Sequence, residues 1–174
     1  YTEIAGYARM TLWVSCPDHD DMDLFAKLRK LDAQGNLVEQ FNIPLEALQG
    51  CKSKDEVPNT NVYRHLGPSA RLRVSHRHLI RPVQDGDEVD SLLSHQKEEK
   101  IHPIGSIVKV EMGFWPCGML FERGEALQLV FAGHEMTLPE TDQLSGEDVT
   151  INHGRHFIHT GDQYPSSLVL PFIS

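Results

Sequence analysis

The sequence has few cysteines and none of the spacings that cysteine-based sites require. Cys16, Cys51 and Cys117 are odd in number and form no Cys-x-x-Cys pair. A disulfide framework uses an even number of cysteines and a thiolate zinc site uses closely spaced ones, so neither is indicated. Unpaired cysteines are typical of a reducing compartment, and we expect a cytoplasmic protein.

A basic run and a long apolar run are also lacking. The formal net charge is -9 at pH 7. Binding to nucleic acid depends on clustered Lys and Arg, which release counterions from the phosphates, so the charge argues against a nucleic-acid partner. No apolar run approaches the roughly 20 residues that cross a bilayer, so no membrane partner is expected either.

The length fits one domain. The chain has 174 residues, of which 40% are hydrophobic, and this composition can bury a core. Tyr1 begins directly in strand-like sequence, without an initiator Met or a signal peptide. We therefore expect residues 1–174 to be a single domain excised from a longer chain.

The stretch 105–133 carries the strongest pattern in the chain. Two apolar alternations of period two lie close together there, and this period indicates half-buried β-strands. Residues with turn chemistry separate them, so we predict two neighbouring strands joined by a turn. The alternating residues are Val108, Val110, Met112 and Phe114, then Leu127, Leu129 and Phe131; the turn residues are Pro116, Gly118, Glu122, Arg123 and Gly124.

Alternation in other segments also predicts β-strands, first over 3–15, where Ile4, Ala8, Met10, Leu12 and Val14 form the apolar face. Residues 3–15 and 24–31 are predicted to form an antiparallel pair, because a short acidic turn joins them. Gly6 marks a bulge or a close backbone approach within the first of these strands. Together the segments predict an all-β sandwich, with the jelly roll as its arrangement. The other expected elements are strands at 37–43, 70–75, 149–151, 156–159 and 168–173, and a single helical turn at 44–48.

Three polar stretches are predicted to be loops. Residues 81–102 are charged and lack periodicity, and a loop of that length is uncommon unless it is functional or packed against something. Contact with a partner would be one reason for a loop of this length. Residues 51–61 and 135–148 are shorter polar loops.

Histidine patterns raise the question of a metal site. His76 and His78 would share one face of a strand, and a second group follows near the C-terminus. Zinc needs three or four ligands, so a third must come from elsewhere, whereas surface or hydrogen-bonded histidines are the commoner case. No metal ligand is assigned. The second group is His153, His156 and His159.

Four aspartates fall in one turn and could offer oxygen ligands to Ca²⁺. The spacing of an EF-hand and its closing Glu are missing, and Asp is also a good turn former, so a solvated turn is preferred. The residues are Asp18, Asp20, Asp21 and Asp23.

No catalytic residue is indicated by the residues themselves. A Gly-x-Ser-x-Gly elbow, which would expose a nucleophilic hydroxyl, is absent. Cys117 lies between Pro116 and Gly118 and reads as a turn residue rather than a thiolate. Trp13 and Trp115 lie on predicted strands, where a Trp forms either a sugar-stacking platform or part of a core or interface.

Four segments, taken in order, carry a resemblance to a known family. Residues 3–36 contain a Gly-bearing strand, an acidic turn and a Lys-Leu-bearing strand that ends in a Gly loop. Residues 72–77 (LRVSHR) precede the long loop, Phe121 and Gly124 follow in the central stretch, and residues 165–171 (PSSLVLP) close the chain. This ordered set resembles the C-terminal domain of the X-Pro dipeptidyl-peptidase and cocaine-esterase family of serine hydrolases.

The resemblance implies a jelly-roll sandwich of the galactose-binding-like type, attached to an α/β-hydrolase domain that lies N-terminal in the parent chain. The family's catalytic Ser, Asp and His belong to that other domain and none maps to this chain, so no catalytic, cofactor-binding or metal residue is carried over and no cofactor is expected. Family members hydrolyse esters or amides, including X-Pro peptides, through an acyl-enzyme.

The family's jelly roll packs on the catalytic domain and helps to wall the substrate cleft. The partners expected from the resemblance are therefore the hydrolase domain of the parent chain and, for a homo-oligomer, a second copy. Trp115, on the opposite face from Phe114, is a candidate for docking. The alternative function is a carbohydrate- or ligand-binding β-sandwich module with Trp13 or Trp115 as its platform.

Overall fold

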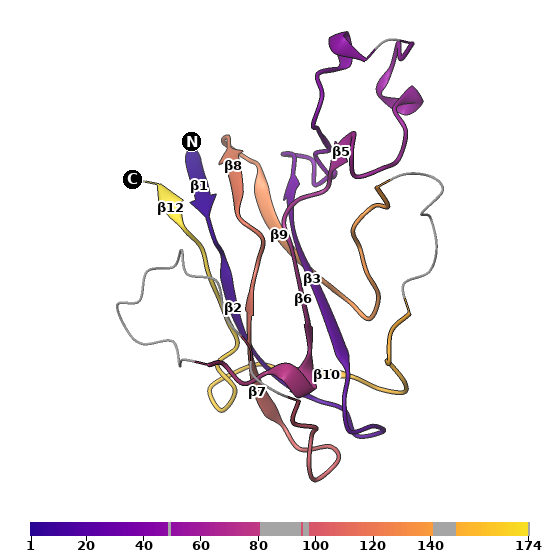
Figure 1. The fold of residues 1–174 in the computed structure, drawn as a ribbon. Helices are drawn as coiled ribbons and strands as arrows, with labels where there is room; N and C mark the ends of the chain where they lie inside the picture. The colour runs from indigo at the N-terminus through magenta and orange to yellow at the C-terminus, as the bar shows by residue number, and fades with distance from the viewer. Residues whose placement is uncertain (49, 81–94, 96–97, 141–148, 174) are drawn as a thin grey trace.

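The computed structural model describes residues 1–48, 50–80, 95, 98–140 and 149–173, and in these the protein is built from antiparallel strands. The only helical elements among them are single 3-10 turns, and none of these could span a membrane. The predicted all-β class is confirmed (Figure 1). The turns are η1 (Leu45–Ala47), η2 (Lys54–Glu56) and η3 (Val74–His76). The strands are β1 (Thr2–Gly6), β2 (Arg9–Ser15), β3 (Asp23–Leu31), β4 (Gln40–Phe41), β5 (Arg64–His65), β6 (Ser69–Arg73), β7 (Val108–Gly113), β8 (Cys117–Phe121), β9 (Ala126–Ala132), β10 (Phe157–His159), β11 (Ser167–Val169) and β12 (Phe172–Ile173).

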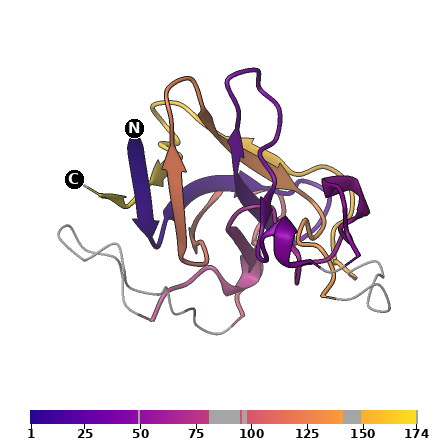
Figure 2. The ribbon, with the colours of Figure 1, turned by 90° about the horizontal axis from the view of Figure 1, so that it is seen from above.

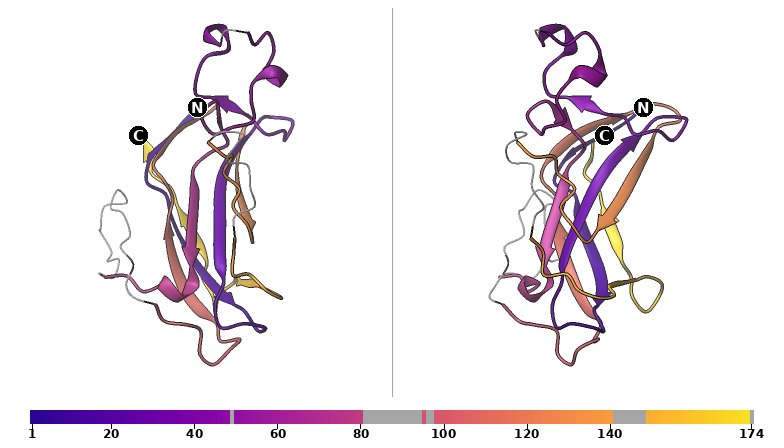
Figure 3. Two further views of the ribbon diagram at one scale, coloured as in Figure 1. Left: turned by 45° about the vertical axis from the view of Figure 1, so that its right-hand side comes forward. Right: turned by 90° about the vertical axis from the view of Figure 1, so that its right-hand side faces the viewer.

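Two layers face each other across the core (Figure 3). In one layer β2 pairs with β7 on one side and with β10 and β11 on the other; in the second layer β3 lies between β6 and β9. Apolar side chains from both layers form one buried cluster, which is the arrangement of a β-sandwich. Its strand residues are Met10, Leu12, Val14, Leu24, Ala26, Leu28, Ala70, Leu72, Val110 and Met112.

The first layer is bent, and three of its four strands are interrupted at the bend. β2, β7 and β11 form one part, and β1, β8 and β12 continue the same strand order beyond the bend. Gly6, with φ of 127°, separates β1 from β2, while Pro116 and Pro171 lie in the other two interruptions. Gly reaches this φ without a steric penalty, and Pro cannot donate a ladder hydrogen bond, so these residues favour the break. Seen from above, β1 and β12 lie side by side, which brings the two ends of the chain together (Figure 2).

The predicted strand at 3–15 is therefore two strands, and its expected apolar face is confirmed. The residues assigned to that face are all buried. Gly6 is a break between two parts of the layer rather than a bulge within one strand. The buried residues are Ile4, Ala8, Met10, Leu12 and Val14.

The predicted pairing of 3–15 with 24–31 is wrong. β2 and β3 lie in opposite layers, and no pairing between them occurs among the described strands. Their apolar faces meet across the core instead of lying side by side, so the acidic turn crosses from one layer to the other.

The central stretch is also arranged differently from the prediction. It contains three strands, and β7, β8 and β9 pair with β2, β1 and β3 respectively rather than with one another. Cys117 and Gly118 belong to β8, so the predicted turn is shorter. It runs from Glu122 to Glu125, where the Glu125 N–H donates to the Glu122 carbonyl oxygen (3.2 Å).

Some of the remaining predicted elements are confirmed and others are wrong. The 3-10 turn η1 and strands β6 and β10 confirm three of them, whereas 37–43 contributes only β4, which pairs with β5 in a separate ribbon projecting from one end of the sandwich (Figure 1). Residues 149–151 form no strand, and Val149 is 96% exposed. The predicted final strand is split into β11 and β12. Most of the predicted loop 81–102, and residues 141–148 of the loop 135–148, lie outside the described residues.

Burial in the core predicts a large stability difference between two leucines. Leu28 on β3 is 1% exposed, whereas Leu120 on β8 is 46% exposed. We expect Leu28→Ala to lower the free energy of unfolding by about 2–5 kcal/mol, since it leaves a cavity. Leu120→Ala is the matched control and should cost under about 1 kcal/mol. Urea unfolding followed by circular dichroism measures both, and equal losses would contradict the two-layer core.

Candidate functional site

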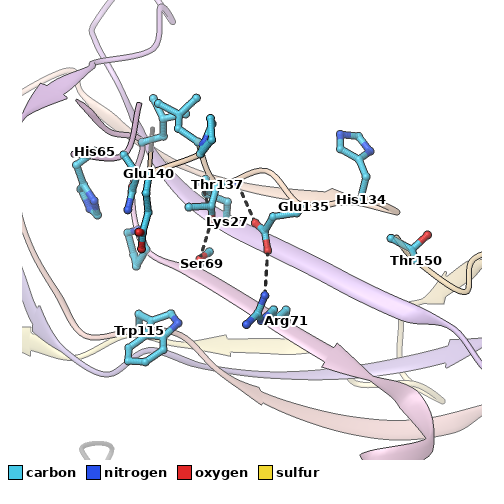
Figure 4. A pocket seen from close by; sticks show the side chains of 16 residues that line it. Lys27, His65, Ser69, Arg71, Trp115, His134, Glu135, Thr137, Glu140 and Thr150 are labelled. Atoms are coloured by element: carbon cyan, nitrogen blue, oxygen red, sulfur yellow. Dashed lines mark hydrogen bonds and ion pairs between the residues drawn. The ribbon is translucent and has the colours of Figure 1, made fainter. Parts of the chain in front are cut away.

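A groove of about 1290 Å³ lies against the outer face of β3 and β6 (Figure 4). Its walls come from segments far apart in sequence: the turn before β6, Trp115 after β7 and the segment that follows β9. The groove is thus a product of the tertiary fold. It is lined by Lys27, Asn61, His65, Leu66, Gly67, Pro68, Ser69, Arg71, Trp115, His134, Glu135, Thr137, Leu138, Pro139, Glu140 and Thr150.

Lys27 is the buried cation of this groove. It lies between two core residues of β3 but points to the outer face, where the segment 134–140 covers it, and it is 2% exposed. Its Nζ donates to the Met136 carbonyl oxygen (2.8 Å) and to Thr137 Oγ1 (3.5 Å). Burial lowers the pKa of Lys27, an effect that the charge of Glu135 opposes. The side chain therefore anchors the segment to the sheet.

Glu135 stabilises the same segment. Its Oε1 accepts the backbone N–H groups of Met136 and Thr137, both at 2.8 Å. Burial acts to raise the pKa of Glu135, but the hydrogen bonds from Thr137 and Met136 outweigh it, so the pKa is lowered and the carboxylate stays charged. Arg71 points toward it (Figure 4), with Nη1 3.9 Å from Glu135 Oε2.

Trp115 provides an open aromatic surface along the same groove. It is 70% exposed, while the preceding Phe114 is 1% exposed, in agreement with their predicted opposite faces. The backbone N–H of Trp115 donates to the Ser69 carbonyl oxygen (3.1 Å), which fixes the backbone of Trp115 beside β6. Trp115 is neither fully exposed nor part of the core, so its role in docking stays a prediction.

Gly67 shapes the wall next to Lys27. Its φ is +100°, and a Cβ at this position would lie 1.8 Å from the Leu28 carbonyl oxygen. The neighbouring Pro68 carbonyl accepts the Leu28 N–H (3.0 Å). Only Gly allows the chain to approach β3 this closely.

Trp13 is a poorer platform than Trp115. It is half-buried, and the ring of Tyr164 packs on it with centroids 5.7 Å apart. His159 lies beside the same Tyr and pairs through Nε2 with Ser15 Oγ (2.8 Å). Trp13 is therefore part of an intramolecular aromatic cluster.

The predicted histidine pairs do not form a metal site in the described part of the chain. His76 belongs to η3 and not to a strand, so the two-residue spacing to His78 does not place both on one face. His78 pairs with Glu99 (2.9 Å), and His153 packs against His19 with ring centroids 5.3 Å apart. Across the described ranges, no three His, Cys, Asp or Glu side chains lie where they could hold one ion.

The four aspartates of the acidic turn point to different partners. Asp18 accepts from Arg155, Asp20 pairs with Lys100 (3.3 Å), and Asp23 accepts from Arg73 (2.8 Å). The fourth, buried Asp21, accepts the backbone N–H groups of Met22 and Ser75, both at 2.9 Å. The turn is held by these separate contacts, which favours the structural reading over a calcium site.

Cys117 has the properties of a packing residue. It contacts the small apolar cluster of Ile4, Met119 and Phe121, and burial raises the pKa of its thiol. A raised pKa lowers the thiolate fraction, so nucleophilic character is disfavoured.

Sequence reasoning identified Trp115 but missed Lys27, Arg71 and Glu135. A signal for Lys27 was present, because it interrupts an apolar strand between Ala26 and Leu28. Its burial beneath a segment more than 100 residues away is a long-range effect that no local pattern encodes.

Comparisons with known proteins agree on one family. The model of the X-Pro dipeptidyl-peptidase C-terminal non-catalytic domain matches residues 1–169. Two crystal structures of a CocE/NonD family hydrolase from Staphylococcus aureus are similar, with a TM-score of 0.73 and 33% and 34% identity. Each alignment covers 99% of this chain and 28% of the solved one, so the chain spans less than a third of those structures. No curated protein sequence matches.

The contacts of Asp18 predict a specific acid dependence. Hydrogen bonds from the Arg155 side chain and backbone lower the pKa of Asp18 from 3.8 to about 2. The folded pKa is below the unfolded one, so the stabilisation is present above about pH 4 and is lost as the pH falls through about 2. Asp18→Asn should therefore be less stable than the wild type near neutral pH, and the difference should shrink on acidification.

Thermal unfolding from about pH 6 to about pH 2 measures this. Asp162→Asn is the matched control, because Asp162 is exposed and pairs with no residue in the described part of the chain. A difference between Asp18→Asn and the wild type that does not vary with pH would show that the Arg155 contact does not stabilise the fold.

The burial of Lys27 predicts a second pH dependence, in the alkaline range and with the same sign of slope. Its folded pKa is lowered, so folding releases a proton in the range between that pKa and the unfolded value of about 10.4, and stability rises with pH there. The free energy of unfolding of the wild type, relative to Lys27→Met, should increase over this range. Lys52→Met, at an exposed position, should show no such trend. A flat difference for Lys27→Met in chemical denaturation would contradict the burial of a titrating ammonium.

Proposed function

Because the chain belongs to the family of X-Pro dipeptidyl-peptidase C-terminal non-catalytic domains, we propose that it is the accessory β-sandwich of a serine hydrolase of the X-Pro dipeptidyl-peptidase and cocaine-esterase type. Residues 1–174 would form one domain, and the α/β-hydrolase domain would lie elsewhere in the parent chain. The parent would hydrolyse ester or amide bonds, X-Pro peptide bonds among them, through an acyl-enzyme.

The family match over residues 1–169 is the observation that carries this proposal. The similar structures support it, because both are hydrolases by name and this chain corresponds to 28% of their length. The remaining length of such a protein is ample for a catalytic domain. In this arrangement the sandwich packs on the catalytic domain and helps to wall the substrate cleft.

The groove is the part of the described surface best suited to that contact. An exposed Trp beside an exposed Arg, here Trp115 and Arg71, is typical of the centre of an interface. Trp115 combines 70% exposure with a fixed backbone position, so it is presented without a large loss of conformational freedom on docking. We further place the parent protein in the cytoplasm, since Cys16, Cys51 and Cys117 are free thiols.

A ligand-binding module is the second candidate, and the exposure of Trp115 in a groove is the observation that favours it. Specific binding of a glycan that disappears in Trp115→Ala, with the circular dichroism spectrum unchanged, would support this function. Trp13→Ala serves as the comparison, because Tyr164 already covers Trp13.

The division of labour between the domains predicts the outcome of an activity assay. The native protein that contains this chain should hydrolyse p-nitrophenyl acetate or an X-Pro p-nitroanilide and should be inactivated by an organophosphate, which phosphorylates serine nucleophiles. The 174-residue chain alone should give no turnover above the uncatalysed rate. Release of p-nitrophenol or p-nitroaniline measures both, and the circular dichroism spectrum of the short chain confirms its fold. Turnover by the short chain that persists through further purification would overturn the proposal.

A further inference from the structure

Arg71 is the groove side chain whose hydrogen-bonding capacity is least used. Its side chain is 77% exposed, and its contact with Glu135 is long, at 3.9 Å. Among the described residues it makes no hydrogen bond. A guanidinium carries five N–H donors in a planar fork that matches a carboxylate, so Arg71 is ready to bind one.

Lys27 places a second positive charge beneath the same groove. Its Nζ donates to the Met136 carbonyl oxygen (2.8 Å) and to Thr137 Oγ1 (3.5 Å), under the segment 134–140. The side chain is 2% exposed, so it acts on a ligand in the groove through its charge and not by direct contact.

The acidic residues of the groove compete little for these donors. Glu135 Oε1 is already occupied by two backbone N–H groups, and its other oxygen remains 3.9 Å from Arg71. Glu140 is exposed, and among the described residues it forms no ion pair with Arg71 or Lys27. The unused hydrogen-bonding capacity of the groove is therefore mainly that of N–H donors, which suits a ligand rich in acceptor oxygens.

Trp115 and Pro68 give the same groove an apolar side. The Trp115 ring is exposed, and both residues line the groove together with Arg71. β6 is also an edge strand of its sheet, and its Ser69 carbonyl oxygen already accepts the Trp115 N–H. An extended segment could follow this edge with one side chain on the ring and another at Arg71.

We propose that the groove binds an acidic peptide segment of the hydrolase domain of the parent chain. A carboxylate of that segment pairs with Arg71, above the buried charge of Lys27, and a neighbouring apolar side chain packs on Trp115. This inference rests on the proposed function and specifies the contact that joins the two domains. Charge complementarity selects the segment, since Arg71 is an exposed cation of the groove whose N–H donors are unused among the described residues.

Hydrogen–deuterium exchange tests the contact in the native protein that contains this chain. Amides of residues 67–73, 113–117 and 134–140 should exchange at least about tenfold more slowly there than in the 174-residue chain alone. Arg71→Glu in the native protein should remove most of that protection, because it places two carboxylates together. Arg123→Glu is the matched control; it makes the same charge change in the exposed turn after β8 and should preserve the protection. Trp115→Ala should weaken the protection in part.

The outcomes separate this inference from the proposed function. Protection of the groove that Arg71→Glu abolishes and Arg123→Glu preserves supports the acidic segment. Protection confined to another face of the sandwich, or groove protection indifferent to Arg71→Glu, overturns the inference and leaves the accessory role standing. Identical exchange of all segments in the native protein and in the short chain overturns both. A synthetic acidic peptide is not needed, because the native chain carries the segment.

Discussion

Apolar side chains of β2 and β7 meet those of β3 and β6 across the middle of the molecule, and the rest of the structure follows from this contact. Each strand must turn one face inward, so the opposite faces are left for other uses. On β3 that outer face carries Lys27, which is covered in turn by the segment 134–140. The groove exists because the core has already fixed the strands that form its floor. Its cations Lys27 and Arg71 lie on the strands β3 and β6 and not on a loop, which is the arrangement expected of a recognition surface.

Lys27 shows how structure and recognition use the same group. Its ammonium ties the segment after β9 to the sheet, and its burial makes any unused donor costly. A hydrophobic residue at this position would pack well but could not orient the Met136 carbonyl. Lys27 therefore contributes less stability than a hydrophobic residue would but makes the hydrogen bond to Met136, as is common for buried charged groups.

The sequence predicted which residues face the core but not which strands lie next to each other. Period-two alternation placed Met10, Leu12 and Val14 correctly, because burial acts on each strand separately. Two strands show the same alternation whether they are neighbours in one sheet or face each other across the core. The pairing of β2 with β3 and of β7 with β9 was therefore predicted wrongly. In the groove, Trp115 was recognisable as an aromatic residue on the face opposite Phe114. Arg71 and Glu135 were not, because they are brought together only by the fold.

The bend in the first layer divides the apolar interior into two clusters. Beyond the interruptions at Gly6, Pro116 and Pro171, the strands β1 and β8 bury a small cluster of their own, and within the described part of the chain Leu127 and Leu170 are the residues that contact both clusters. Local opening costs least free energy where few buried contacts join a segment to the rest of the domain. The bend therefore favours local opening at this end of the sandwich over opening of the layers around β2 and β3.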